Sequence, residues 1–264
     1  RTLLFPREFY EFDAQGKPVY YSPYNGKIQD GYMYTDNGFW DTFRAVHPLF
    51  TLLYPEVSER VTQSILNAYD ESGFMPEWAS PGHRECMIGN NSISLLTDAW
   101  MKGIRTICPE KALEAMIHQT EARHPGISSV GRDGFGYYDR LGYVPYPEVH
   151  EATAKTLEYA YADWCVARFA DSIGRKEIAD TYYRKALNYR NLYYPDYGFM
   201  WAKDANGKWR DAFDATEWGG PFTEGSSWHW TWSVLHDPEG LSRLMGGHTA
   251  MEARLDSMFT APNT

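Results

Sequence analysis

Hydrophobic positions along the chain alternate between two kinds of segment. Residues 39–54 and 92–104 are apolar on most faces of a helix, whereas residues 56–72 and 109–123 each carry one apolar stripe opposite polar side chains. A helix with one stripe buries one face, and a helix that is apolar nearly all round is buried on most sides. The pattern therefore predicts buried and half-buried helices in turn.

The clearest pair of such helices lies in the middle of the chain. Residues 151–173 carry two apolar faces, and residues 175–193 have one polar face. Gly174 separates the two segments as a helix-stop signal. A further buried helix is expected over 225–236, followed by two short helices over 238–245 and 249–259.

Stacked helical hairpins, with an inner layer of buried helices wrapped by an outer layer, produce this alternation. We therefore expect an all-α fold, either an α/α toroid or a helical solenoid. The absence of self-similar repeats disfavours a solenoid of sequence repeats. The pattern contains roughly nine helices, about three fewer than the twelve of a closed six-hairpin toroid. No low-complexity run or linker interrupts residues 1–264, so we expect a single domain.

The segments between the predicted helices indicate two candidate functional loops and one β-hairpin. Long polar and aromatic connections over 76–91 and 132–150 precede buried helices, and loops of this length in compact domains are often functional. The Asn-Gly pair at 206–207 lies between two short aromatic strings. It predicts a β-hairpin with a type I′ turn.

Composition and charge exclude several classes of function. The chain has 25 Lys and Arg against 35 Asp and Glu, for a net charge of −10, which disfavours binding to nucleic acids or membrane surfaces. It contains no apolar run long enough to span a bilayer. The three cysteines lack zinc-ligand spacing, and motifs of nucleotide-binding proteins, zinc hydrolases and serine hydrolases are missing. Aromatic residues make up 16% of the chain, which fits carbohydrate binding as well as an aromatic-rich core.

Carboxylates embedded among aromatic residues are the remaining candidates for chemistry. Asp41 lies in the string FWDTFR, Glu224 lies in TEGSSWHW, and Glu151 opens the helix with two apolar faces. If these are inner helices of a toroid, their N-termini gather at one mouth. Partial burial among tryptophan rings favours the protonated form of a carboxyl, as a general acid requires, whereas a helix N-terminus opposes it. Helix N-capping or a first-turn charge is the alternative interpretation of Asp41 and Glu151.

Five strings, in order along nearly the whole chain, resemble the calcium-dependent exo-α-mannosidases of glycoside hydrolase family 92. The resemblance implies an (α/α)6 toroid, of which residues 1–264 form an incomplete part, with an N-terminal β-sandwich and the C-terminal part of the toroid absent. The strings are YTDNGFWDTFRAVHPLFTLLYP (34–55), RECMIGNNSISLLTDAWMKGI (84–104), LGYVPYPEVHEATAKTLEYAYADWCVARFADSIG (141–174), YRNLYYPDYGFM (189–200) and TEGSSWHWTWSVLHDPEGLSRLMGG (223–247).

The resemblance also implies roles for individual residues. Glu224 falls on the glutamate of the family's T-E-G motif, its general acid. Trp40, Asp41 and Arg44 fall on W-D-T-F-R, which lines the subsite for the terminal mannose, and Trp228 falls where an aromatic residue follows the acid. The implied reaction is inverting hydrolysis of terminal α-linked mannose from glycans, with acid and base carboxyls roughly 6.5–9.5 Å apart.

The chain departs from the family pattern at several places. It has Ser226-Ser227-Trp228-His229-Trp230 where the family commonly reads N-A-W-Q-Y, and Asn90-Asn91 where some members carry a histidine. The family places its general base and its Ca²⁺-binding segment downstream of Thr264. We therefore expect the base and the calcium ligands to come from the rest of the polypeptide or from a second chain, and the isolated chain to be inactive.

The family is largely bacterial and exported, so the resemblance implies a periplasmic or secreted protein. Two other interpretations remain. The chain could belong to another (α/α)6 inverting glycosidase, trehalase-like or glucosidase-like, or it could be a non-catalytic helical carbohydrate-binding module. A preference for α-glucosides would favour the first, and full activity of a Glu224→Gln variant would favour the second.

Overall fold

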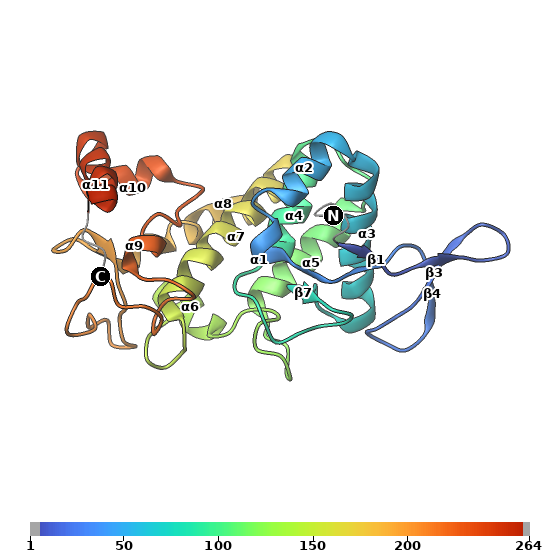
Figure 1. Ribbon diagram of the computed structural model, residues 1–264, viewed down its shortest axis with the longest axis horizontal. Helices are drawn as coiled ribbons and strands as arrows, with labels where there is room; N and C mark the ends of the chain where they lie inside the picture. Colours follow the sequence, from blue (N-terminus) through green and yellow to red (C-terminus); the bar gives the residue numbers. More distant parts are fainter. Residues whose placement is uncertain (1–5, 261–264) are drawn as a thin grey trace. The chain divides into compact units, whose positions relative to one another are not determined.

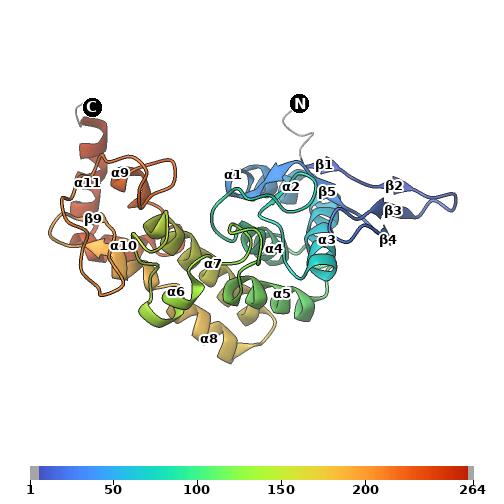
Figure 2. The ribbon, with the colours of Figure 1, turned by 90° about the horizontal axis from the view of Figure 1, so that it is seen from below.

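The computed structural model describes residues 6–260, which divide into two compact units. Unit 1 contains the residues up to 133 together with 165–182, and unit 2 contains 134–164 together with the residues from 183 onward. Figures 1 and 2 show the helices and strands of both units. Each unit is described by itself below.

Unit 1 is mainly helical, as the sequence pattern predicts. Pro55 opens α3 and Gly73, with φ +82°, ends it, so both boundaries follow the usual preferences for these residues. The apolar stripes are buried, including Val61, Ile65 and Leu66 of α3. The helices of this unit are α1 (Phe39–Thr42), α2 (Val46–Leu53), α3 (Pro55–Ser72), α4 (Asn91–Met101), α5 (Pro109–Glu121), the C-terminal part of α7 (Ala152–Ser172) and most of α8 (Lys176–Lys185).

Short strands before α1 correct the expectation of an all-α fold. They were missed because each is only two to four residues long and most lie at the surface, which leaves no alternating pattern to detect. All pairings are antiparallel: β1 (Arg7–Glu8) with β5 (Tyr34–Thr35), β2 (Glu11–Phe12) with β3 (Pro18–Tyr21), β3 with β4 (Ile28–Asp30), and β6 (Asn37–Gly38) with β7 (Trp78–Ala79).

Unit 2 contains the start of α7 and the C-terminal helices. The two apolar faces expected for α7 are largely buried, with Leu157 and Ala160 on one face and Cys165 and Phe169 on the other. The other elements of this unit are α6 (Phe135–Leu141), a 3₁₀-helix (Asn188–Leu192), β8 (Tyr193–Tyr194), β9 (Phe199–Met200), α9 (Ser227–Trp230), α10 (Pro238–Met245) and α11 (His248–Thr260).

Several helix boundaries differ from those that the hydrophobic pattern predicts. The helix expected over 39–54 is two helices, and the one over 225–236 is the single turn α9. The helix over 175–193 ends at Lys185 because its last carbonyls have tertiary partners. The Tyr138 hydroxyl donates to the Lys185 carbonyl at 3.3 Å, and His236 Nε2 lies 2.8 Å from the Ala186 carbonyl oxygen. Helix α6 was missed, since Tyr138 is its one fully buried residue.

The hairpin predicted around Asn206-Gly207 is confirmed, but its turn type is wrong. Lys203 and Trp209 form the β-bridge, and Asp204 N–H donates to the Lys208 carbonyl at 2.9 Å. A type I′ turn requires positive φ at both central residues. Only Gly207 has it, at +85°, so the loop is a type I turn followed by a left-handed glycine.

Candidate active site

Glu224 lies on a loop of unit 2 whose backbone is fixed on both sides of it. Gly219 N–H donates to the Gly225 carbonyl at 2.8 Å, and Trp230 Nε1 donates to the Thr223 carbonyl at 2.8 Å. Glu224 itself has φ +44° and an exposed side chain. A left-handed backbone at a residue other than glycine costs free energy, and such strain concentrates at functional sites. The loop therefore presents this carboxylate to solvent in a defined position.

The helix after Glu224 holds the loop in place. Ser226 caps α9, with its N–H and hydroxyl 3.2 and 3.1 Å from His229 Nδ1. A Cβ on Gly225 would lie 3.1 Å from His229 Cβ and 3.2 Å from Trp230 Nε1, so the close approach favours glycine there. The half-buried Trp228 ring packs against Phe199, 4.7 Å between centroids at 79°.

The same loop covers the N-terminus of α7. The Gly220 carbonyl accepts from Glu151 N–H at 3.2 Å, and the Pro221 carbonyl accepts from Thr153 and Ala154 N–H at 3.0 and 3.2 Å. These N–H groups have no partner within a helix, so the loop supplies their acceptors. The structure thus brings the loop that carries Glu224 against the segment of Glu151.

An ion pair anchors the start of the loop. Arg210 donates two hydrogen bonds to Glu217, at 2.7 and 2.8 Å, and its guanidinium lies 5.4 Å from the Tyr146 ring centroid. The hydrogen bonds to Glu217, together with its negative charge, raise the pKa of Arg210 above its usual value. The ion pair with Arg210 therefore gives Glu217 a structural role at the start of the loop.

Trp40, Asp41 and Arg44 lie in and just after α1, in unit 1. Asp41 is exposed, Trp40 is half-buried, and the Arg44 guanidinium carbon is 5.9 Å from the Trp40 ring centroid. The indole offers a stacking face, while the carboxylate accepts and the guanidinium donates hydrogen bonds. This combination suits a polyhydroxylated ligand.

The start of α1 is fixed by buried polar contacts. The Thr42 hydroxyl donates to Asn37 Oδ1 at 2.7 Å, and His47 Nε2 is 3.5 Å from the same oxygen. Phe39 N–H donates to the Glu77 carbonyl at 3.0 Å. Burial lowers the pKa of His47 to about 4, so this imidazole is neutral at neutral pH.

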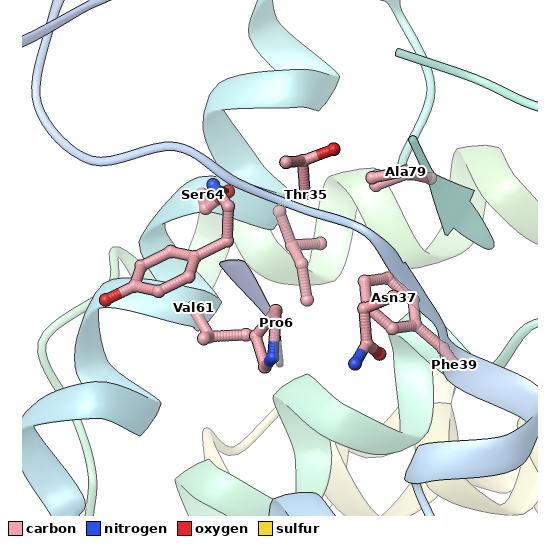
Figure 3. Close-up of a pocket in the computed structure, with 10 residues that line it drawn as sticks. Pro6, Thr35, Asn37, Phe39, Val61, Ser64 and Ala79 are labelled. Atoms are coloured by element: carbon pink, nitrogen blue, oxygen red, sulfur yellow. Dashed lines mark hydrogen bonds between the residues drawn. The ribbon is translucent and has the colours of Figure 1, made fainter. Parts of the chain in front are cut away.

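Asn37 and Phe39 also line a small cavity with Thr35, Val61 and Ser64 (Figure 3). Its volume of about 10 Å³ is near the lower limit for one water molecule. It is a packing feature behind α1 and too small for a sugar.

Asp41 and Glu224 lie in different units, so their expected meeting at one mouth of a toroid stays a prediction. Asp41 lies in the first turn of α1, but the structure gives that helix no side-chain cap. Asp41 is therefore a first-turn charge, which is one form of the alternative interpretation, and not an N-cap. Glu151 immediately precedes α7 and has φ +55°.

The buried carboxyl of Glu77 was not among the candidates from the sequence. It is 1% exposed and accepts hydrogen bonds from Ser92 N–H (3.1 Å), Ser92 Oγ (2.8 Å) and Gln119 Nε2 (3.0 Å). It therefore caps α4 and ties that helix to α5. Burial raises the pKa of Glu77 to about 8, although the hydrogen bonds oppose the rise. A single glutamate in a loop gives no sequence signal for such a role.

Glu77 predicts a specific pH dependence of stability. Because its pKa is higher in the folded than in the unfolded chain, its contribution is complete below about pH 4.5 and is lost as the pH rises through about 8. The free energy of unfolding should therefore fall by up to a few kcal/mol from pH 5 to pH 8. In Glu77→Gln, this slope of the free energy of unfolding against pH should be smaller. Urea unfolding at both pH values measures it. The exposed Glu121→Gln should keep the wild-type slope; an unchanged slope in Glu77→Gln would contradict the assignment.

Two features of the described residues bear on cofactors and membranes. Within residues 6–260, no group of three or more His, Cys, Asp or Glu side chains is arranged to hold a metal ion. Over the same residues, no helix has both the length and the apolar character needed to cross a bilayer.

A helical domain with an exposed carboxylate on a strained loop beside aromatic rings has the elements of a glycoside hydrolase site. Residues 1–264 match the family model described as glycosyl hydrolase family 92 catalytic domain. The chain therefore belongs to glycoside hydrolase family 92, which confirms the resemblance found in the sequence.

Two solved structures that resemble this chain are mannosidases of family GH92. The chain is 84% identical to an inverting mannosidase of family GH92 from Bacteroides thetaiotaomicron VPI-5482, with a TM-score of 0.97, covering 100% of this chain and 36% of that one. A GH92 α-mannosidase from Bacteroides thetaiotaomicron, solved in complex with mannoimidazole, is 30% identical with a TM-score of 0.88, covering 98% and 34%.

A curated relative from Arthroderma benhamiae, named an uncharacterized secreted glycosidase, is 26% identical over 225 residues. That match covers 73% of this chain and 29% of the relative. The chain thus spans about a third of the length of these relatives.

Proposed function

We propose that this chain is part of the catalytic domain of an inverting exo-α-mannosidase that removes terminal α-linked mannose from glycans. The observation that carries the proposal is the exposed Glu224 carboxylate on a loop fixed at both of its neighbours. The 84% identity to an inverting mannosidase supports the choice of substrate and stereochemistry.

Glu224 is the general acid in this proposal. Its carboxyl protonates the glycosidic oxygen as the bond to the leaving group breaks, a role typically worth about 10²–10⁴-fold in rate. A second carboxylate activates water on the opposite face of the sugar, roughly 6.5–9.5 Å from the acid. We propose that this base lies in another part of a longer protein or in a second chain.

Trp40, Asp41 and Arg44 bind the terminal mannose in this proposal. The indole stacks on the sugar ring, while the Asp41 carboxylate and the Arg44 guanidinium bond its hydroxyls. Hydrogen bonds to charged groups contribute about 1.5–3 kcal/mol each, so these two side chains select a correctly placed polyol. Trp228 supplies an aromatic edge beside the acid loop.

Calcium is the cofactor that the family resemblance implies. Within residues 6–260, no three or more His, Cys, Asp or Glu side chains are grouped so that they could hold a metal ion, and calcium sites are built largely from carboxylates. We propose that the calcium ligands lie elsewhere in the longer protein.

The architecture and location follow the same reasoning. We propose that the helices of this chain form part of an (α/α)6 toroid, with a β-sandwich elsewhere in the protein. We propose a periplasmic or secreted location, a suggestion supported by the name of the secreted relative.

The stereochemistry of the product tests the proposed function. The longer protein should release β-mannose first from an α-mannobiose, because water attacks the face opposite the leaving group. Proton NMR of the anomeric signals during the first minutes measures this. Release of α-mannose would contradict inversion, and a preference for α-glucosides would contradict the mannosidase assignment.

A further inference from the structure

Trp218 is unusual among the tryptophans of the chain. All ten lie within the described residues 6–260, and only Trp218 is exposed, at 65% of its surface. Burying an indole stabilises a fold by about 25 cal/mol per Å² of apolar surface. A single exposed apolar side chain is common, so the location of Trp218 decides its meaning.

Trp218 is joined to the acid loop by the backbone. The residue that follows it, Gly219, donates to the carbonyl of Gly225, the residue that follows Glu224, at 2.8 Å. Because this path consists of one hydrogen bond and a few backbone bonds, the Cα atoms of Trp218 and Glu224 are at most about 12 Å apart. The two side chains are therefore placed within reach of neighbouring parts of one saccharide.

The Trp218 ring also packs on a fixed partner. It forms an edge-to-face contact with His229, 5.4 Å between centroids at 83°. The α9 capping contacts to Ser226 hold that His229 ring, and the Arg210 ion pair holds the preceding residue, Glu217. An edge-to-face contact occupies at most one face of the indole, so a broad face is available to a ligand.

The geometry points to Trp218 as the stacking platform for the leaving-group sugar, on the side of the scissile bond that the acid protonates. This inference rests on the proposed function. An exo-acting hydrolase encloses the terminal sugar and leaves the remainder of the glycan facing solvent. An exposed indole beside the acid therefore suits the sugar that departs, since it binds the apolar C–H face of a pyranose.

Two substrates distinguish binding of the leaving-group sugar by Trp218 from a general effect on folding or catalysis. An α-mannobiose has a sugar leaving group, whereas α-mannosyl fluoride has neither a sugar nor an aromatic one. In the longer protein, Trp218→Ala should lower kcat/KM for α-mannobiose about tenfold, comparable to loss of a weak aromatic stacking contact. It should change kcat/KM for α-mannosyl fluoride less than twofold. Trp218→Phe should restore most of the loss because it keeps an aromatic face.

Controls keep the inference distinct from the proposed function. Tyr21→Ala removes another exposed aromatic side chain, 63% exposed on β3, and should leave both substrates unaffected. Equal losses on both substrates, or no loss with α-mannobiose, would overturn the platform role. Failure of the wild-type protein to hydrolyse either mannoside would instead refute the proposed function.

Discussion

Glu224→Gln should lower kcat/KM for α-mannobiose about 10³-fold in the longer protein, near the middle of the range for general acids. A sugar alkoxide is a poor leaving group, so it needs a proton as the bond breaks. Glutamine preserves the size of the side chain and removes that proton. Steady-state hydrolysis at the pH optimum measures the loss.

Glu252→Gln is the matched control for this variant. Glu252 is an exposed glutamate on α11 in the same unit, and its change should leave kcat/KM within twofold of wild type. The circular dichroism of both variants should match wild type, because Glu224 is exposed and the loop is fixed by backbone bonds. Full activity of Glu224→Gln would support a carbohydrate-binding role for the chain instead.

The 264-residue chain alone should turn over α-mannobiose at least about 10³-fold more slowly than the longer protein, down to the rate without protein, because the acid acts only together with its base. Inverting hydrolysis needs two carboxyls on opposite faces of the sugar. We propose that this chain supplies only the acid, while the base and the calcium ligands lie elsewhere. Assay of both proteins at equal concentration measures the difference.

A matched variant makes the comparison with the isolated chain sharper. Glu224→Gln should not change the residual rate of the isolated chain, since the acid has no base to act with. Appreciable turnover by the chain that is lost in Glu224→Gln would place a base among these 264 residues and contradict the proposed location.

Long helices were predicted from the sequence because their apolar spacing repeats over several turns. Helices α3, α4, α5 and α7 follow their expected ranges within three residues. Helix α9 was overextended because the apolar run continues past Trp230. Thr231 instead bonds across to β9, where its hydroxyl accepts from Met200 N–H at 2.9 Å. Such a tertiary contact leaves no trace in periodicity.

The residues of the candidate site were predicted from short sequence motifs more than from the spacing of hydrophobic positions. Glu224 stands out in the sequence through its T-E-G string, but its left-handed backbone and the bond from Gly219 to Gly225 depend on the folded loop. Trp218 was missed because ten tryptophans look alike in a sequence, and only exposure distinguishes this one. Glu77 was missed because its donors come from two other helices.

The dependence of the Glu224→Gln effect on the leaving group tests the central claim most directly. A 2,4-dinitrophenolate departs without a proton, so 2,4-dinitrophenyl α-mannoside does not need the acid. The account predicts that Glu224→Gln slows α-mannobiose about 10³-fold but the dinitrophenyl substrate less than about tenfold. Equal losses on the two substrates would contradict a general-acid role for Glu224.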